Sequence, residues 1–176
     1  EAMKHGGNRV HTHSVERDSR EFIARADADI SQLVKNALRD DGFVIQYQPL
    51  LDLQNRGSET YEIVLRLPNL QGDLIGGKAL LDAAKAADSC QALDQWILDR
   101  AIDILKQRRE SGRRTLIFVH QSSQSALNPD LPVWLAGRLR KKQIVGTGLV
   151  IDFRLPDLSH NLKVAQANIA ALREMD

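Results

Sequence analysis

The chain has 176 residues, of which 43% are hydrophobic and 27% are charged. These proportions are typical of a globular protein with one domain of ordinary size, and they exclude a disordered chain. The formal net charge is only +1, so no extended basic surface for a nucleic acid polymer is expected. The single cysteine, Cys90, excludes an intramolecular disulfide and is typical of a reducing compartment.

The sequence shows no pattern of a membrane-spanning helix or of an N-terminal signal peptide. No apolar run reaches the roughly 18 residues that a membrane-spanning helix needs, and the first residues lack a charged-then-apolar signal pattern. We therefore expect a cytoplasmic location for this segment, which leaves room for a membrane anchor outside it. The chain begins at Glu1 without an initiator methionine and stops at Asp176 within a helical pattern, so we expect both ends to continue in a longer protein.

The first forty residues predict a short terminal piece followed by a helix. Two glycines and an asparagine, at positions 6–8, supply the positive φ angles of a helix stop and a tight turn. From Ser19 to Arg39 apolar residues recur at helical spacing, which predicts an amphipathic connecting helix. Packing of this helix on the following domain is favoured over a coiled-coil seam, because only about two heptads are available.

Beyond Gly42 the pattern changes to strands that alternate with helices, which predicts an α/β fold with a parallel sheet. The pattern alone does not choose between a doubly wound sheet and a barrel, although no glycine-rich phosphate loop follows any strand. The expected strands are Val44 to Leu53, Tyr61 to Leu67, Thr115 to His120 and Leu149 to Phe153, and the expected helices are Gly77 to Ala87, Gln91 to Ser111, Pro132 to Lys142 and Leu162 to Met175.

Three segments together resemble the opening of an EAL domain, a family that binds the bacterial second messenger cyclic di-GMP and cleaves it in active members. They are Asp41 to Pro49 (DGFVIQYQP), Tyr61 to Leu67 (YEIVLRL) and Leu93 to Leu98 (LDQWIL). The resemblance runs from residue 41 to the end of the chain. It implies a TIM-like (β/α)-barrel, present as roughly its first half, with site residues at the strand C-terminal ends.

A second, shorter resemblance concerns the N-terminus. The segment Ala2 to Val10 (AMKHGGNRV) is similar to the C-terminal end of a GGDEF domain. The predicted organisation is therefore a GGDEF tail at 1–13, an amphipathic connecting helix at 14–41, and the N-terminal half of an EAL domain at 42–176.

The EAL resemblance implies three positions that hold metal in active members. Glu62 keeps the first ligand, whereas His120 replaces an asparagine and Asp152 replaces a glutamate. Leu155 replaces a further glutamate of the same strand motif. Imidazole suits zinc, copper or nickel better than magnesium, and the change to aspartate retracts a carboxylate by about 1.5 Å. Hydrolysis with Mg²⁺ or Mn²⁺ is therefore not expected. Without the resemblance, His120 is interpreted as a structural histidine at a strand end, and Glu62 as a carboxylate paired with a nearby cation.

Three positions that the family uses for ligand binding are kept. Gln48 matches a side chain that contacts the dinucleotide, and Arg66 matches the arginine that follows the Glu-Ala-Leu motif. A guanidinium suits phosphate and guanine acceptors because its paired donors are fixed in one plane. Asp94 matches an acid that accepts hydrogen bonds from guanine. Binding through these residues needs no cofactor.

The leading hypothesis is a catalytically degenerate EAL domain that binds cyclic di-GMP as a receptor and relays it to a protein partner. The run after Glu62 is similar to the FimX-like type, which implies a PilZ-domain protein as that partner. Two alternatives stay open: a weak metal-dependent phosphodiesterase that yields linear pGpG, and an interaction module that no longer binds nucleotide. Because half a barrel leaves an open sheet edge, we expect either a second half in the native protein or self-association of this half alone, for example as a homodimer.

Overall fold

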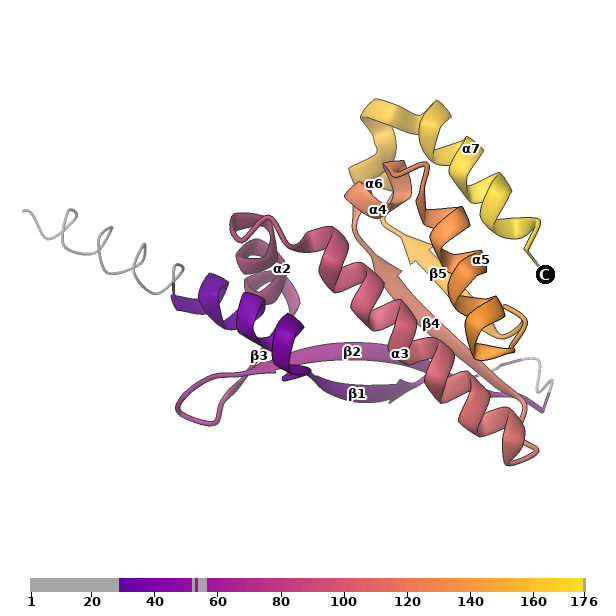
Figure 1. Ribbon diagram of the computed structural model, residues 1–176, viewed down its shortest axis with the longest axis horizontal. Coiled ribbons are helices and arrows are strands. Elements are labelled where there is room, and N and C mark those ends of the chain that lie inside the picture. The colour runs from indigo at the N-terminus through magenta and orange to yellow at the C-terminus, as the bar shows by residue number, and fades with distance from the viewer. Residues whose placement is uncertain (1–28, 52, 54–56, 176) are drawn as a thin grey trace, which may run out of the picture.

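The computed structural model describes residues 29–51, 53 and 57–175 (Figure 1). The expected GGDEF tail at 1–13 and the first part of the connecting helix lie outside these residues. The described chain begins with a helix over 29–40. It continues with β1 (Val44–Pro49), β2 (Glu59–Pro68), β3 (Leu74–Gly76), α2 (Gly77–Ala86), α3 (Cys90–Glu110), β4 (Thr115–Gln121), α4 (Ser123–Leu127), α5 (Leu131–Lys142), β5 (Leu149–Phe153), α6 (Leu155–Leu158), η2 (Ser159–Asn161) and α7 (Leu162–Arg173).

One sheet holds all five strands, in the order β1-β2-β4-β5, with β3 paired to β2. The strands β2, β4 and β5 are parallel, whereas β1 and β3 are antiparallel to β2. The predicted α/β class with parallel strands is confirmed. The antiparallel direction of β1 follows from the length of its connection: only nine residues, 50–58, separate β1 from β2, and a parallel pair needs a crossover of a dozen or more residues.

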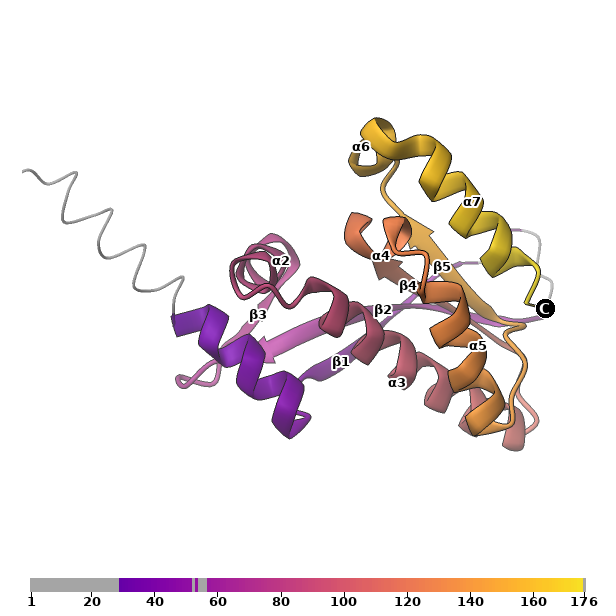
Figure 2. The same cartoon turned by 45° about the horizontal axis from the view of Figure 1, so that its top comes forward.

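The helices cover one face of the sheet (Figures 1 and 2). Alternate strand residues point toward α3, because side chains along a strand alternate between the two faces. Ile63 of β2 and both Ile117 and Val119 of β4 join Leu98 and Leu105 of α3 in one buried cluster. None of the buried clusters in the described chain takes a residue from the opposite face. That face is therefore left partly exposed, and the candidate residues of β1, β2, β4 and β5 lie on it.

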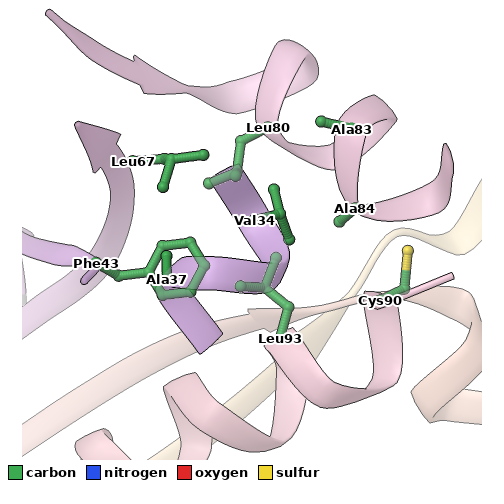
Figure 3. Close-up of a cluster of buried hydrophobic side chains, with 9 residues drawn as sticks. All are labelled: Val34, Ala37, Phe43, Leu67, Leu80, Ala83, Ala84, Cys90 and Leu93. Carbon is green, nitrogen blue, oxygen red and sulfur yellow. The ribbon is translucent and has the colours of Figure 1, made fainter. Parts of the chain in front are cut away.

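The connecting helix packs into the core of the domain. Val34 and Ala37 from the helix over 29–40 meet Leu67 of β2 and Leu80 of α2, together with Phe43, in a second buried cluster (Figure 3). This agrees with the predicted packing of the helix against the following domain. The helix ends at Asp41, whose φ of 59° lies in the left-handed region.

The boundaries of the longer elements follow the sequence closely, and the differences have local causes. The first strand ends at Pro49 rather than Leu53, since Leu51 and Leu53 are 86% and 88% exposed in the connection that follows. The three-residue β3 and the short α4 and α6 were not predicted, because such short elements show no periodicity. Of the helices in the described residues, none combines the length and apolar character that a membrane crossing needs.

Candidate functional site

The row of residues at the centre of the exposed face contains two of the predicted site residues. Gln48 on β1 is paired with Glu62 on β2, and Glu62 is paired in turn with Phe118 on β4. Residues paired in this way have their side chains on the same face of the sheet. The structure therefore brings together Gln48 and Glu62, while the neighbour of Glu62 on the other side is an aromatic ring that offers no metal ligand.

The other two predicted metal positions contact each other. His120 of β4 and Asp152 of β5 are register partners, and His120 Nδ1 lies 2.7 Å from Asp152 Oδ2. With the proton on Nδ1, the imidazole donates to the carboxylate. Both side chains remain accessible, at 40% and 46% exposure. Two of the three predicted metal positions are thus linked to each other as an acid–imidazole pair.

Glu62 does not join this pair. The pairing of β2 with β4 ends at Glu62 and Phe118, whereas His120 lies two residues further along β4. In Figure 1 β2 and β4 lie side by side near their N-terminal ends and diverge toward their C-terminal ends. Within the described residues, no group of three or more His, Cys, Asp or Glu side chains lies close enough to hold a metal ion. These residues do not by themselves fit a Mg²⁺ or Mn²⁺ site.

Arg66 lies on the same face as Glu62, four residues further along β2, which is a separation of about 13 Å. At this level β2 is flanked by Val44 of β1 and Gly76 of β3. Arg66 Nη1 donates to the carbonyl of Leu65 at 3.2 Å. No carboxylate of the described chain forms a recorded ion pair with Arg66, so its positive charge is not neutralised by these residues. A half-exposed guanidinium of this kind is suited to an anionic ligand.

Asp94 is placed differently from the other predicted ligand residues. It is only 8% exposed and reaches from α3 to the start of α4. Its Oδ2 accepts hydrogen bonds from the backbone N–H of Ser122 at 3.0 Å, the Ser122 hydroxyl at 2.5 Å and the Ser125 hydroxyl at 2.6 Å. Burial raises the pKa of the Asp94 carboxyl above its usual 3.8, and the bonds from Ser122 and Ser125 oppose this rise. One oxygen of the Asp94 carboxylate, Oδ2, is therefore already occupied by hydrogen bonds within the protein.

Two residues that support the site were missed by the sequence reasoning. Ser122 caps α4, where its hydroxyl accepts from the Ser125 N–H at 3.4 Å. A serine directly before a helix is a recognisable capping signal, although nothing in the sequence ties it to Asp94. Gly76, opposite Arg66, is the second such residue, and a glycine before a predicted helix gives no signal of the side chain that it faces.

A surface pocket of about 340 Å³ lies away from all these residues. It is lined in part by Trp96, Arg100, Trp134 and Arg138, from α3 and α5. Arg100 lies over the Trp96 ring at 5.3 Å and Arg138 lies over the Trp134 ring at 5.4 Å. None of the predicted site residues lines this pocket: those of the strands lie on the open face of the sheet, and Asp94 is buried between α3 and α4.

Comparison with known proteins identifies the fold. The sequence profile of the EAL domain matches residues 31–176. The chain belongs to the EAL domain family. Among solved structures, the FimX EAL domain from Pseudomonas aeruginosa, bound to c-di-GMP, superimposes with a TM-score of 0.75 at 30% identity, over 83% of this chain and 58% of that chain. The mixed sheet and its helices therefore correspond to part of a TIM-like EAL barrel, as the family resemblance implied.

Two curated relatives match at lower coverage of their own length. An uncharacterised 76.5 kDa protein of Thiocystis violacea, from the region 3′ of phbC, is 29% identical over 174 residues, which are 98% of this chain and 25% of that protein. The cyclic di-GMP phosphodiesterase NbdA of P. aeruginosa is 29% identical over 100 residues, 56% of this chain and 13% of that protein. This EAL chain is therefore related both to a cyclic di-GMP-binding domain and to a phosphodiesterase, and it spans only part of each.

Proposed function

We propose that this EAL chain binds cyclic di-GMP as a receptor and does not cleave it. The observation that carries the proposal is the 2.7 Å contact between His120 and Asp152, because it links two family metal positions to each other and leaves Glu62 apart. Metal-dependent hydrolysis in this family requires those positions to act together on one divalent site. Arg66, by contrast, keeps its charge available for a phosphate or a guanine edge.

The proposed ligand contacts come from three elements, β1, β2 and α3. Gln48 on β1 and Arg66 on β2 offer donors on the open face of the sheet. Asp94 would accept from a guanine through Oδ1, since its Oδ2 is held by Ser122 and Ser125. The EAL domain of P. aeruginosa FimX, which is structurally similar over 83% of this chain, was solved with c-di-GMP bound, and this likeness supports the choice of ligand.

Isothermal titration of the 176-residue chain with cyclic di-GMP tests binding. Arg66→Ala should weaken the affinity by about 10- to 100-fold, which corresponds to the loss of one or two charge-assisted hydrogen bonds. Arg140→Ala on α5 is a matched control, since it removes the same charge from an exposed side chain whose recorded bond is to Ala136 O at 3.4 Å. Unchanged affinity in Arg66→Ala would show that the site is misplaced.

Incubation with Mg²⁺ or Mn²⁺ and chromatography of the products separates the receptor from the enzyme. We expect cyclic di-GMP to remain intact. Rapid formation of linear pGpG would contradict the receptor and favour a phosphodiesterase like the relative NbdA. An absence of binding would contradict both and leave an interaction module without a nucleotide.

A receptor needs a partner that reads the bound state, and we propose a PilZ-domain protein for this role. Its complex with the chain should form more readily with cyclic di-GMP present, as measured by co-elution in size-exclusion chromatography. Equal co-elution with and without the nucleotide would contradict a ligand-dependent relay.

A further inference from the structure

The side chain of Arg66 lies across a residue that has no side chain. Arg66 on β2 is directly paired with Gly76 on β3. A Cβ atom built at Gly76 would overlap Arg66 Nη1, and it would lie only 2.9 Å from Cδ and 3.0 Å from Cζ of the same arginine. Carbon atoms that are not bonded rest at about 3.5–4.0 Å from each other. Any side chain at position 76 would therefore displace the guanidinium.

The backbone at Gly76 does not itself require glycine. Its φ of −156° and ψ of −172° are extended angles that any residue adopts. The next residue shows the contrast: Gly77 has a φ of 56°, in the left-handed region, and a Cβ there would meet nothing within 4 Å. Glycine is thus required at these two adjacent positions for different physical reasons. Gly77 allows the backbone to turn into α2, whereas Gly76 leaves room for Arg66.

In the position that Gly76 permits, the Arg66 guanidinium keeps most of its N–H donors free for a ligand. The hydrogen bond from Arg66 Nη1 to Leu65 O, at 3.2 Å, uses one of five N–H groups. We infer that Gly76 is a positioning residue for Arg66: because Gly76 has no side chain, the guanidinium that we propose binds the ligand can lie against β3. The inference rests on the proposed function for the identity of the ligand, but the contact between the two residues does not.

Gly76→Ala tests this role without removing a charge. In titration with cyclic di-GMP, the affinity should fall by about 10- to 100-fold, as for a displaced charge-assisted bond. Gly137→Ala is the matched control, because Gly137 lies in α5, has no positive φ, and a Cβ there would meet nothing within 4 Å. Its affinity should stay within twofold of wild type. Equal affinity in Gly76→Ala and wild type would overturn the inference.

A rescue experiment separates positioning from a general effect on the fold. Lysine at position 66 carries a single nitrogen on a slender stem, so it fits beside the added methyl group with a smaller displacement than the branched, planar guanidinium needs. The affinity lost through Gly76→Ala should therefore be several-fold smaller in the Arg66→Lys background than with Arg66 present. An equal loss in both backgrounds would show that Gly76 acts through something other than the guanidinium.

A second readout does not depend on any ligand. The Nε–H signal of Arg66 in ¹⁵N NMR, assigned by its disappearance in Arg66→Lys, should shift in Gly76→Ala and stay in place in Gly137→Ala. If the wild-type chain fails to bind cyclic di-GMP, the proposed function falls, while this shift still decides whether Gly76 positions Arg66. An unmoved signal would overturn the positioning role whatever the affinity.

Discussion

Replacing Asp94 by alanine should destabilise the fold more than its polar character suggests. Asp94 is 8% exposed and lies on α3, while its three hydrogen-bond donors all belong to Ser122 and Ser125 at the start of α4. The carboxylate therefore connects two elements that are 28 to 31 residues apart in the chain. Alanine would leave the backbone N–H of Ser122 without an acceptor, because a backbone donor cannot rotate to another partner.

The expected loss can be estimated from these bonds. A hydrogen bond to a charged group contributes about 1.5–3 kcal/mol, and the two serine hydroxyls can recover part of their loss by turning elsewhere. Relief of the buried charge offsets a further part. We expect a fall of about 3 kcal/mol in the free energy of unfolding for Asp94→Ala. With a urea slope of about 2 kcal/mol/M, the midpoint should drop by about 1.5 M.

Asp94→Asn adds a dependence on pH with a definite sign. Burial raises the folded-state pKa of Asp94 above 3.8, so the folded chain binds this proton more tightly than the unfolded chain. The contribution of this group is fully present below pH 3.8 and is lost as the pH rises through the raised folded pKa. Asparagine does not titrate. The stability of wild type relative to Asp94→Asn should therefore decrease as the pH rises from 3 toward neutrality.

Asp103→Ala is the control for the loss of an acid from the same helix. Asp103 is paired with Lys142 at 2.8 Å, and its side chain is 48% exposed, so its removal should cost less than about 1 kcal/mol. A loss below about 0.5 kcal/mol in Asp94→Ala would refute the reasoning. So would a difference between wild type and Asp94→Asn that does not change with pH.

Three further outcomes are expected. Leu98 is 0% exposed in the core beneath the sheet, so Leu98→Ala should lower the free energy of unfolding, measured by urea titration, by about 2–5 kcal/mol. Leu155 is 68% exposed, so the control Leu155→Ala should change that free energy by less than about 0.5 kcal/mol. Asp41 accepts from Trp96 Nε1 at 2.9 Å, and an ion pair with Arg100 holds its pKa below 3.8. The stability that Asp41→Asn removes, a change that the left-handed φ of 59° tolerates, should therefore be under about 1 kcal/mol near neutral pH and should disappear in acid as the carboxylate protonates, which paired urea titrations measure. Light scattering of the 176-residue chain should show self-association, because the outer edges of β1 and β5 have no partner in the described residues, and a monomer would contradict this.

The sequence predicted the elements that have a strong period or a clear boundary. The fourth predicted strand, Leu149 to Phe153, matches β5 at both ends, since a run of apolar residues interrupted only by Asp152 follows Gly148. The sequence could not predict β3, because three residues are too few to show a hydrophobic periodicity. Nor could it predict that Asp94 would be held by Ser122, because the two meet only when α3 packs beside the end of β4. The family resemblance named the site positions, but the contact of His120 with Asp152 depends on the register of two strands.

Under the proposed function, the metal positions on β4 and β5 and the ligand-binding arginine lie on different strands, so hydrolysis can be lost without loss of binding. His120 and Asp152 belong to β4 and β5, where they bond to each other. Arg66 belongs to β2 beyond the level at which β2 pairs with β4, and its neighbours there are β1 and β3. Changes of side chain on β4 and β5 therefore do not alter the room that Gly76 gives to Arg66. This independence supports a receptor that has lost its metal positions and kept a cation for the nucleotide.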